Sequence, residues 1–489
     1  MDTSTVRLIM LILEWIFLIF TVTIIIAYII LGVYSTIESV EYIKKNSFVN
    51  YRNILSSNFS PSISILAAAY NESLNIIENV RSLLSLHYAN YEVIIINDGS
   101  DDDSLEQLIE AYSLVKINYL VNEQIKTKPL RAGIFKSTDP AFEKLTVIDK
   151  ENGGKADALN MGLNICKSNH VISVDVDCLL LEDSLLKLIK PFLEATDKRV
   201  IAAGGVIRIA NSCKIRDGKL IDINLPKGFL EKFQILEYMR AFLLGRMAWS
   251  RLNGLLVISG AFGMFDKEIV IKVGGYDSST VGEDMELIVR MRRYMEEEKL
   301  KYKVAYIPDP LCWTEAPDNL KTLVSQRNRW TRGTIETLRR HRKIGLNPKY
   351  HRLGLVSMPY WFTYERMAPI IEVLGIIYFI ILISLNQVRW DYVIAFFVFA
   401  YIFTVNYSVL SIISEDLSFH QYKKKGTASR LFLIGLLEPF IFHPVILYSA
   451  IAGNIDYFFN KDKRWGKMQR KGLVKHEKNY SQNENTILQ

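Results

Sequence analysis

The chain has 489 residues, of which 49% are hydrophobic and 23% are charged, and its mean hydropathy is above zero. It is too long for one ordinary domain and too apolar for an ordinary soluble protein, so a membrane-embedded part is expected. The net charge of +7 is small for this length, and the basic residues cluster beside apolar segments. This distribution favours contact with a lipid bilayer and argues against a nucleic-acid partner. Four scattered cysteines without metal-ligand spacing fit a reduced, cytoplasmic compartment.

Four apolar segments indicate membrane helices. The first runs from Leu8 to Tyr34 with Glu14 as its only charged residue, and it exceeds the roughly 20 apolar residues that cross a hydrocarbon core. The other three follow residue 350, at 368–385, 393–413 and 431–452. We therefore expect a transmembrane helix with a basic linker at 1–50, a catalytic domain at 60–345, an interfacial segment with transmembrane helices at 350–460, and a basic polar tail at 461–489.

Between the membrane segments, apolar runs alternate with stretches of helical periodicity. In chain order the pattern predicts a strand at 62–70, a helix at 72–86, a strand at 91–97, a helix at 104–114, a short strand at 117–121, a helix at 155–166, a strand at 170–176 and a helix at 285–298. This alternation is typical of an α/β fold with a mostly parallel sheet that is covered on both faces.

Polar side chains follow three of the predicted strands, namely Asn71 with Glu72, Asp98, and Asp175 with Asp177. Because ligands bind beyond the carboxyl ends of such strands, we expect these side chains to converge on one crevice. Two carboxylates at alternate positions suit a hard cation and the diphosphate that it neutralises. An Asp-x-Asp alone is more often a surface turn, but the neighbouring strand end at Asp98 favours the functional interpretation.

Three further groups are candidates for chemistry. Lys155 follows two glycines at a predicted helix N-terminus, which suits a phosphate, although a solvated lysine would look the same. Asp284 begins a charged helix, either as a general base or as a helix cap. Gln326, Arg329 and Trp330 offer cationic and stacking groups, and the alternative is a helix at the membrane interface.

In this order the motifs resemble those of the family 2 inverting glycosyltransferases, in particular the membrane synthases of poly-N-acetylglucosamine, hyaluronan and cellulose type. The motifs are Ala69-Tyr70-Asn71-Glu72, Asn97-Asp98-Gly99-Ser100, the segment from Gly153 to Asn160, Asp175-Val176-Asp177, Glu283-Asp284, and Gln326-x-x-Arg329-Trp330. Any one of them is common, but six in this order are specific. The resemblance covers residues 60–340 and the flanking spans, and it implies a GT-A type α/β domain.

The resemblance also implies roles for the residues. Tyr70, Glu72 and Asp98 would hold the uridine, Lys155 the diphosphate, Asp175 the nucleotide, and Asp177 with Asp175 an Mg²⁺ or Mn²⁺ ion. Asp284 would be the base, and Gln326, Arg329 and Trp330 would line the acceptor end and close over the diphosphate.

The implied activity is inverting transfer of N-acetylglucosamine or another hexose from a UDP-sugar to a growing polysaccharide at the cytoplasmic membrane face, with accessory membrane subunits as further partners. One alternative is a non-processive transferase that adds one sugar to a lipid carrier. Another is a scaffold that binds the nucleotide sugar without turnover, against which stands the full set of charged groups.

The gating motif of cellulose synthases is absent. Lys463-Arg464-Trp465-Gly466 is only loosely similar to the Trp-Gly segment of hyaluronan-type synthases, and a membrane anchor is the plainer interpretation.

The charge pattern conflicts with a simple membrane topology. One N-terminal span and three C-terminal spans would place the tail on the side opposite the catalytic domain, yet residues 461–471 are strongly basic and favour the cytoplasmic side. Glu438, Pro439, His443 and Pro444 interrupt the last apolar segment. A broken or re-entrant helix there is one expected solution.

Overall fold

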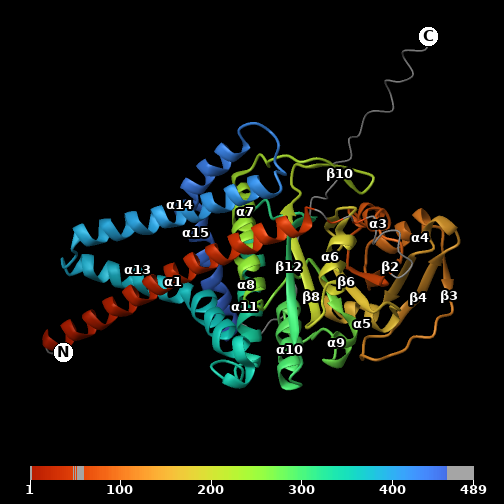
Figure 1. The fold of residues 1–489 in the computed structure, drawn as a ribbon, viewed down its shortest axis with the longest axis horizontal. Helices are drawn as coiled ribbons and strands as arrows, with labels where there is room; N and C mark the ends of the chain where they lie inside the picture. The colour runs from red at the N-terminus through yellow and green to blue at the C-terminus, as the bar shows by residue number, and fades with distance from the viewer. Residues whose placement is uncertain (1–2, 48, 50, 52–59, 460–489) are drawn as a thin grey trace, which may run out of the picture.

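The computed structural model describes residues 3–47, 49, 51 and 60–459, so the basic tail and its Lys463–Gly466 segment lie outside the described residues. Figure 1 shows an α/β part built around one large sheet and a group of long helices that extends away from it. The sheet contains ten strands in the order β3-β4-β5-β2-β1-β6-β11-β8-β12-β7. Their bounds are β1 Ile63–Ala69, β2 Tyr91–Asp98, β3 Leu114–Ile117, β4 Leu130–Ser137, β5 Leu145–Lys150, β6 His170–Asp175, β7 Cys178–Leu180, β8 Arg199–Ile209, β11 Phe262–Asp266 and β12 Tyr302–Thr314.

The core of the sheet is parallel. Strands β5, β2, β1 and β6 pair in parallel, with Ala67 of β1 opposite Ile95 of β2 and Val174 of β6. Further out, β8 pairs with β12 in parallel, whereas the pairs β3/β4, β4/β5, β6/β11, β8/β11 and β7/β12 are antiparallel. The predicted α/β fold with a parallel core is confirmed, and all four of its carboxyl ends point to the same edge.

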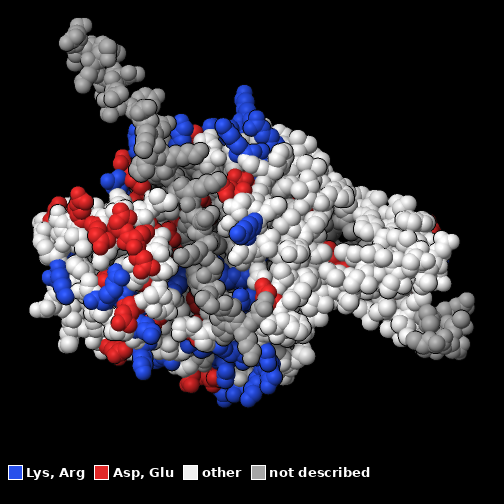
Figure 2. Space-filling view, turned by 180° about the vertical axis from the view of Figure 1, so that it is seen from behind, with Lys and Arg blue, Asp and Glu red and all other residues white. Residues whose placement is uncertain are grey.

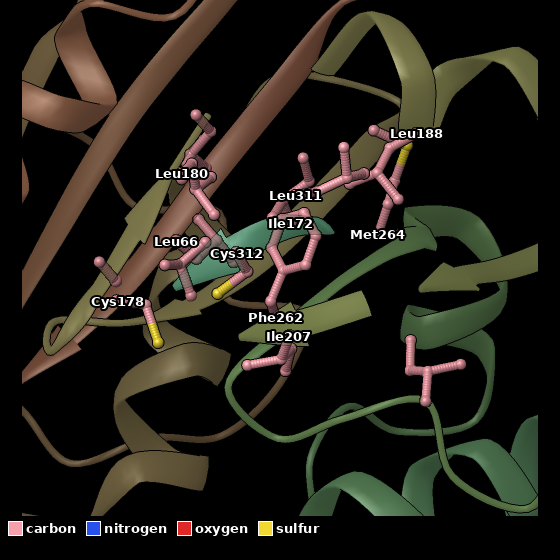
Figure 3. Close-up of a cluster of buried hydrophobic side chains, with 14 of the residues drawn as sticks. Leu66, Ile172, Cys178, Leu180, Leu188, Ile207, Phe262, Met264, Leu311 and Cys312 are labelled. Atoms are coloured by element: carbon pink, nitrogen blue, oxygen red, sulfur yellow. The ribbon is translucent and has the colours of Figure 1, made fainter. Parts of the chain in front are cut away.

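Helices pack closely on this core. The helices of the α/β part are α3 Ile76–Leu84, α4 Ser104–Ala111, α5 Lys155–Ile165, α6 Ser184–Leu193, α7 Phe229–Tyr238, α8 Met247–Arg251, α9 Lys267–Lys272, α10 Glu283–Glu297 and α11 Leu320–Arg340. On α5, a Cβ at Gly162 would lie 3.0 Å from Leu66 and 3.1 Å from Ile96, so the glycine allows the helix to sit directly on β1 and β2. Figure 3 shows buried side chains from β1, β6, β8, β11 and β12 pointing toward one another, with Leu188 of α6 among them.

Shorter elements complete the fold. They are the hairpin of β9 Lys214–Arg216 and β10 Lys219–Asp222, the helical turns η1 Pro140–Phe142, η2 Met239–Arg246, η3 Pro348–Tyr350, η4 Leu353–Ser357 and η5 Trp361–Arg366, and α12 Met358–Tyr360.

Two predicted elements have different bounds. The helix expected at 104–114 ends at Ala111, because Ser113 has a φ of 49° and the next residue already belongs to a strand. The strand expected at 117–121 lies instead at Leu114–Ile117, where it pairs antiparallel with β4. Its first residue is buried, and this tertiary contact decides the register.

The long apolar helices are α1 Thr3–Asn46, α13 Ala368–Ser384, α14 Trp390–Ser418 and α15 Thr427–Phe459. Among the described residues, α1, α14 and α15 are long and apolar enough to cross a membrane, and a fourth span results if Leu353–Arg366 and α13, bent by 40°, count as one. Figure 2 shows that the helical extension carries few charged residues, in contrast to the rest of the visible face. The chain thus has the composition of a membrane protein.

The interruption expected in the last apolar segment is not found. Helix α15 continues through Pro439 and Pro444 without a break. Packing along its length outweighs the two missing hydrogen bonds, since neighbouring groups can satisfy the freed backbone. The bend lies instead directly before α13.

Candidate active site

One cavity of about 2840 Å³ opens at the carboxyl edge of the parallel strands. Its walls include every residue that the sequence singled out for chemistry, namely Tyr70, Glu72, Asp98, Lys155, Asp175, Asp177, Asp284, Gln326, Arg329 and Trp330. The cavity continues between the long helices, where residues of α1, α13, α14 and α15 line it. The expected convergence on one crevice is therefore observed, and the crevice reaches the membrane helices.

Asp98 ends β2 and is only 3% exposed. Its carboxylate accepts hydrogen bonds from the backbone N–H groups of Gly153 at 3.0 Å and Gly154 at 2.7 Å, and from the Lys150 ammonium at 2.8 Å. Gly154 has a φ of 86°, a conformation that favours glycine. Asp98 thereby fixes the turn that leads into α5 and to Lys155.

Lys150 is fully buried at the end of β5 and links two acidic residues. Its ammonium lies 2.8 Å from Asp98 and 2.6 Å from Asp157, and it also donates to the carbonyl oxygen of Glu151. Three acceptors for one ammonium satisfy all of its donors, as a buried charge requires.

Lys155, at the start of α5, joins the strand end of β6 to α10. Its ammonium lies 2.5 Å from Asp175 and 3.7 Å from Glu283, and it donates to the carbonyl oxygen of Gly260 at 2.8 Å. Burial alone would lower the pKa of Lys155, but the carboxylates of Asp175 and Glu283 raise it above its ordinary value. The lysine is therefore a permanent cation in the cavity wall.

The Asp-x-Asp pair offers two hard oxygen ligands. The Asp175 side chain is 29% exposed, and Asp177, 8% exposed, lies two residues after the end of β6, with Cys178 Sγ 3.6 Å from its Oδ1. Within the described part of the chain, no group of three or more His, Cys, Asp or Glu side chains is arranged to hold a metal. This donor set fits an Mg²⁺ or Mn²⁺ ion that takes its other ligands from a substrate diphosphate and water.

Asp284 lies in the first turn of α10, but the N-cap position is held by Gly282, which has no side chain to make a cap hydrogen bond. The capping alternative for Asp284 is therefore wrong. Its carboxylate takes the space that a side chain at Gly260 would fill, because a Cβ there would lie 3.0 Å from Oδ2. Next to it, burial raises the pKa of Glu283.

Helix α11 touches the start of α10 through two glycines. A Cβ at Gly282 would lie 2.7 Å from the Cα of Gly333, so only glycine allows this backbone approach. The Glu336 carboxylate of α11 accepts hydrogen bonds from the Thr280 hydroxyl at 2.6 Å and the Val281 N–H at 3.0 Å. The loop that presents Asp284 is thus fastened to α11.

Gln326, Arg329 and Trp330 lie three and four residues apart on α11, which places them on one helix face. The guanidinium of Arg327 stacks over the Trp330 ring at 4.0 Å and bonds Glu237 of α7 at 2.7 Å. The ring stays 44% exposed. Gln326 Oε1 is buried without a hydrogen-bond partner among the described residues, so it can accept a hydrogen bond from a ligand hydroxyl.

Tyr70 and Glu72 lie at the open rim of the cavity. Tyr70 is 43% exposed, with its hydroxyl 3.5 Å from Asp101, and the backbone N–H of Glu72 donates to Ser104 Oγ at 3.1 Å. Asn71 between them has a φ of 55°, which turns the chain after β1.

The sequence analysis missed several residues that shape this site. A signal existed for Lys150, since Asp149 and Lys150 follow the apolar run of β5 just as Asp98 follows β2. Gly260 and Gly333 had no usable signal, because their importance comes from contacts with distant segments. The same holds for Glu237, which supports Arg327 from another helix.

Replacement of Lys150 by methionine tests the charge balance at the strand ends. Lys150→Met leaves Asp98 and Asp157 buried without their counter-ion, which is expected to cost about 3–5 kcal/mol of folding free energy. The melting temperature of the purified protein in detergent should fall clearly, whereas Lys126→Met, at an exposed position, should leave it unchanged. An unaltered melting temperature for Lys150→Met would contradict the assigned role.

Comparisons with known proteins agree with this geometry. Residues 61–333 match the family described as glycosyltransferase like family 2, and residues 277–423 match the chitin synthase family. A poly-beta-1,6-N-acetyl-D-glucosamine synthase of Staphylococcus epidermidis is 27% identical over 376 residues, which cover 76% of this chain and 78% of the relative. One from Staphylococcus aureus (strain COL) is 31% identical over 280 residues, 57% of this chain and 56% of the relative.

Among solved structures, a mannosyltransferase from Pyrobaculum calidifontis in complex with GDP-Man and Mn²⁺ is similar over 89% of this chain and 99% of its own, with 15% identity and a TM-score of 0.48. The family match spans more than half of the chain and includes all of the parallel core, α10 and the Gln-x-x-Arg-Trp motif. The protein therefore belongs to the family 2-like glycosyltransferases, with a GT-A type α/β domain.

Proposed function

We propose that the protein transfers N-acetylglucosamine, or another hexose, from a UDP-sugar to a growing polysaccharide at the cytoplasmic face of a membrane. The observation that carries this proposal is one continuous cavity, which runs from the Lys155 cluster to the long apolar helices. A soluble transferase has no need of an acceptor path that ends between membrane helices. The relatives named poly-beta-1,6-N-acetyl-D-glucosamine synthase support the choice of sugar and product.

In this proposal the donor lies along the strand ends. Tyr70, Glu72 and Asp98 surround the uridine, and the diphosphate lies beside Lys155 at the N-terminus of α5, where a helix favours anions. Because Asp98 already accepts three hydrogen bonds, its main task is to hold the Gly153–Gly154 turn in place, with its remaining lone pairs facing the nucleotide.

Asp175 and Asp177 would hold the divalent cation. When bound, the ion neutralises charge on the diphosphate and so makes UDP a better leaving group. The ammonium of Lys155 and the guanidinium of Arg329 add positive charge on the same side. The protein thereby prepares the cavity for the charge that develops on the leaving group.

Asp284 accepts the proton of the acceptor hydroxyl. The electron pair left on the acceptor oxygen forms a bond to the anomeric carbon of the donor sugar. The bond from that carbon to the diphosphate oxygen breaks, and UDP leaves with its electron pair. The configuration at the anomeric carbon inverts because attack and departure take place on opposite faces. Trp330 offers a stacking surface for the acceptor ring, and Gln326 Oε1 offers an acceptor for one of its hydroxyls.

The acceptor then leads away along aromatic side chains of the membrane helices. The cavity wall there includes Phe17 and Tyr28 of α1, Phe379 of α13 and Phe397 of α14. Aromatic faces support sugar rings in sequence without fixing their orientation strongly, as a sliding polymer requires. The same apolar wall also suits a lipid-linked acceptor, so a single addition to a lipid carrier is the second candidate function.

Incubation of the purified enzyme with radiolabelled donors distinguishes polysaccharide synthesis from the addition of a single sugar to a lipid carrier. We expect UDP-N-acetylglucosamine, tested beside UDP-glucose, UDP-galactose and UDP-glucuronate, to give a polymer that is retained on a sizing column. A product of one added sugar that partitions into organic solvent would support the lipid-carrier function instead. Hydrolysis of every donor without a glycan product would contradict both.

Removal of divalent cations tests the role of the Asp-x-Asp pair. Activity should vanish with EDTA and return with Mg²⁺ or Mn²⁺, and Asp177→Asn should need a higher metal concentration for half-maximal rate. The exposed control Asp197→Asn should need the same metal concentration for half-maximal rate as the unaltered enzyme. The same metal titration for Asp177→Asn and the unaltered enzyme would remove Asp177 from the metal site.

Replacement of Asp284 by asparagine tests the base. Asparagine keeps the size of the side chain but takes no proton, so transfer should fall by about 10²-fold to 10⁴-fold while UDP affinity stays within a few fold. Folding should change little, because Gly282 caps the helix. Glu298→Gln, the same loss of charge at the other end of α10, is the control. Near-normal transfer by Asp284→Asn with inactive Glu283→Gln would assign the base to Glu283.

A further inference from the structure

Helix α15 begins and ends on the α/β part of the protein. Just before its first turn, the Lys424 ammonium donates to Asp222 of β10 at 3.3 Å. In its last turn, Asn328 of α11 donates to Asp456 at 2.7 Å. These two contacts lie at opposite ends of a helix of 33 residues, which spans about 50 Å.

The middle of α15 also packs on the α/β part. The Phe442 ring stacks on Phe233 of α7 with centroids 5.4 Å apart, and Glu438 forms an ion pair with Arg240 of η2. In its most apolar stretch 28% of the residues are buried, compared with 11% for α1 and 6% for α14. The helix therefore lies along the α/β part over its whole length.

The opposite face of α15 is apolar and exposed. Leu433, Phe440, Tyr448 and Ile455 are 57%, 68%, 66% and 51% exposed, and they extend along most of the helix. An apolar strip of this length on a protein surface needs a non-aqueous partner. It is continuous with the bundle of membrane helices, since the Tyr401 ring of α14 lies beside the Phe440 ring with centroids 5.4 Å apart and a tilt of 36°.

Helices α1, α13 and α14 have a different arrangement. They extend together away from the sheet, whereas α15 runs across the base of this bundle along α7 and α11 (Figure 1). Ring contacts join them far from the sheet, with Phe17 of α1 5.7 Å from Tyr378 of α13, and Phe379 of α13 6.3 Å from Phe397 of α14. Each of the three therefore has one end at the α/β part and one end remote from it.

We propose that α15 does not cross the membrane but lies in its plane, on the side of the catalytic domain, with its exposed face in the boundary between lipid headgroups and acyl chains. A crossing helix separates its ends by a hydrocarbon core of about 30 Å, so both ends could not contact the same water-exposed domain. The spans are then α1, α13 and α14. The partner of the apolar strip is the lipid surface itself.

This arrangement removes the conflict between the basic tail and the spans. With three crossings, all three basic clusters fall on the same side of the membrane as the catalytic domain. They are Lys44 and Lys45 at the end of α1, Lys423–Lys425 before α15, and the basic residues in 461–471. The remote loop between α13 and α14 carries a single basic residue, Arg389. Such asymmetry is what orients membrane proteins, and a fourth crossing by α15 would break it.

Depth measurements on single spin labels in proteoliposomes test the orientation directly. Leu433→Cys and Ile455→Cys lie 22 positions apart, or about 33 Å along the helix. We expect both labels, and one at Phe440→Cys, to report the same shallow depth. Ile394→Cys and Ile413→Cys on α14 are the matched control and should report opposite sides of the bilayer. A depth gradient along α15 equal to that along α14 would overturn the proposal.

Labelling in intact cells tests the same proposal without purification. In a Cys213→Ser background, where the other three native cysteines are buried, an impermeant maleimide should reach Asp391→Cys in the first turn of α14, beside the remote loop. It should reach Lys425→Cys and a cysteine appended after Gln489 only after permeabilisation. Labelling of the appended cysteine but not of Lys425→Cys in intact cells would show that α15 crosses. Neither experiment depends on the catalysed reaction.

Discussion

Four carboxylates gather around two lysine ammoniums at the carboxyl edge of the sheet, and the geometry of the site depends on these ion pairs. Lys150 pairs with Asp98 and Asp157, and Lys155 pairs with Asp175 and Glu283. A buried charge without its partner is far more costly than a buried pair, so each lysine fixes the position of two carboxylates. These pairs link the ends of β2, β5 and β6 to α5 and α10. The candidate site residues are therefore held by electrostatics between elements that are remote in sequence.

The sequence predicts the parallel core well and the outer strands poorly, for a physical reason. Strands β1, β2 and β6 are covered on both faces and read as continuous apolar runs. In contrast, β8 contains Gly204 and Gly205, a pair that usually indicates a turn. Here a Cβ at Gly204 would lie 2.9 Å from Ile258, and one at Gly205 would lie 2.9 Å from Leu311. The glycines therefore permit close packing within a strand. Tertiary contacts decide whether a glycine forms a turn or permits close packing within a strand.

The site residues at strand ends and helix starts could be predicted, whereas those that hold them in place could not. Asp98, Asp175 and Lys155 stand at positions where local sequence already indicates an exposed edge of a sheet. Glu237 and Glu336 lie inside helices with no local feature, and their role follows only from contacts with α11 and the Thr280 loop. Proline misled the prediction for α15 in the same way, because support along the whole helix compensates for Pro439 and Pro444.

Helix α11 connects the candidate active site to α15. One side of it meets Gly282, just before α10 and Asp284, through Gly333, and another side meets Asp456 of α15 through Asn328. Trp330 lies on α11 between Asn328 and Gly333, which make these two contacts. The Arg327 guanidinium lies over its ring. If α15 lies in the lipid headgroup region, α11 is the element that lies between Asp284, the proposed base, and the membrane surface. Under the proposed function, a glycan that leaves the site along the cavity enters the bundle of α1, α13 and α14, whose residues line that cavity.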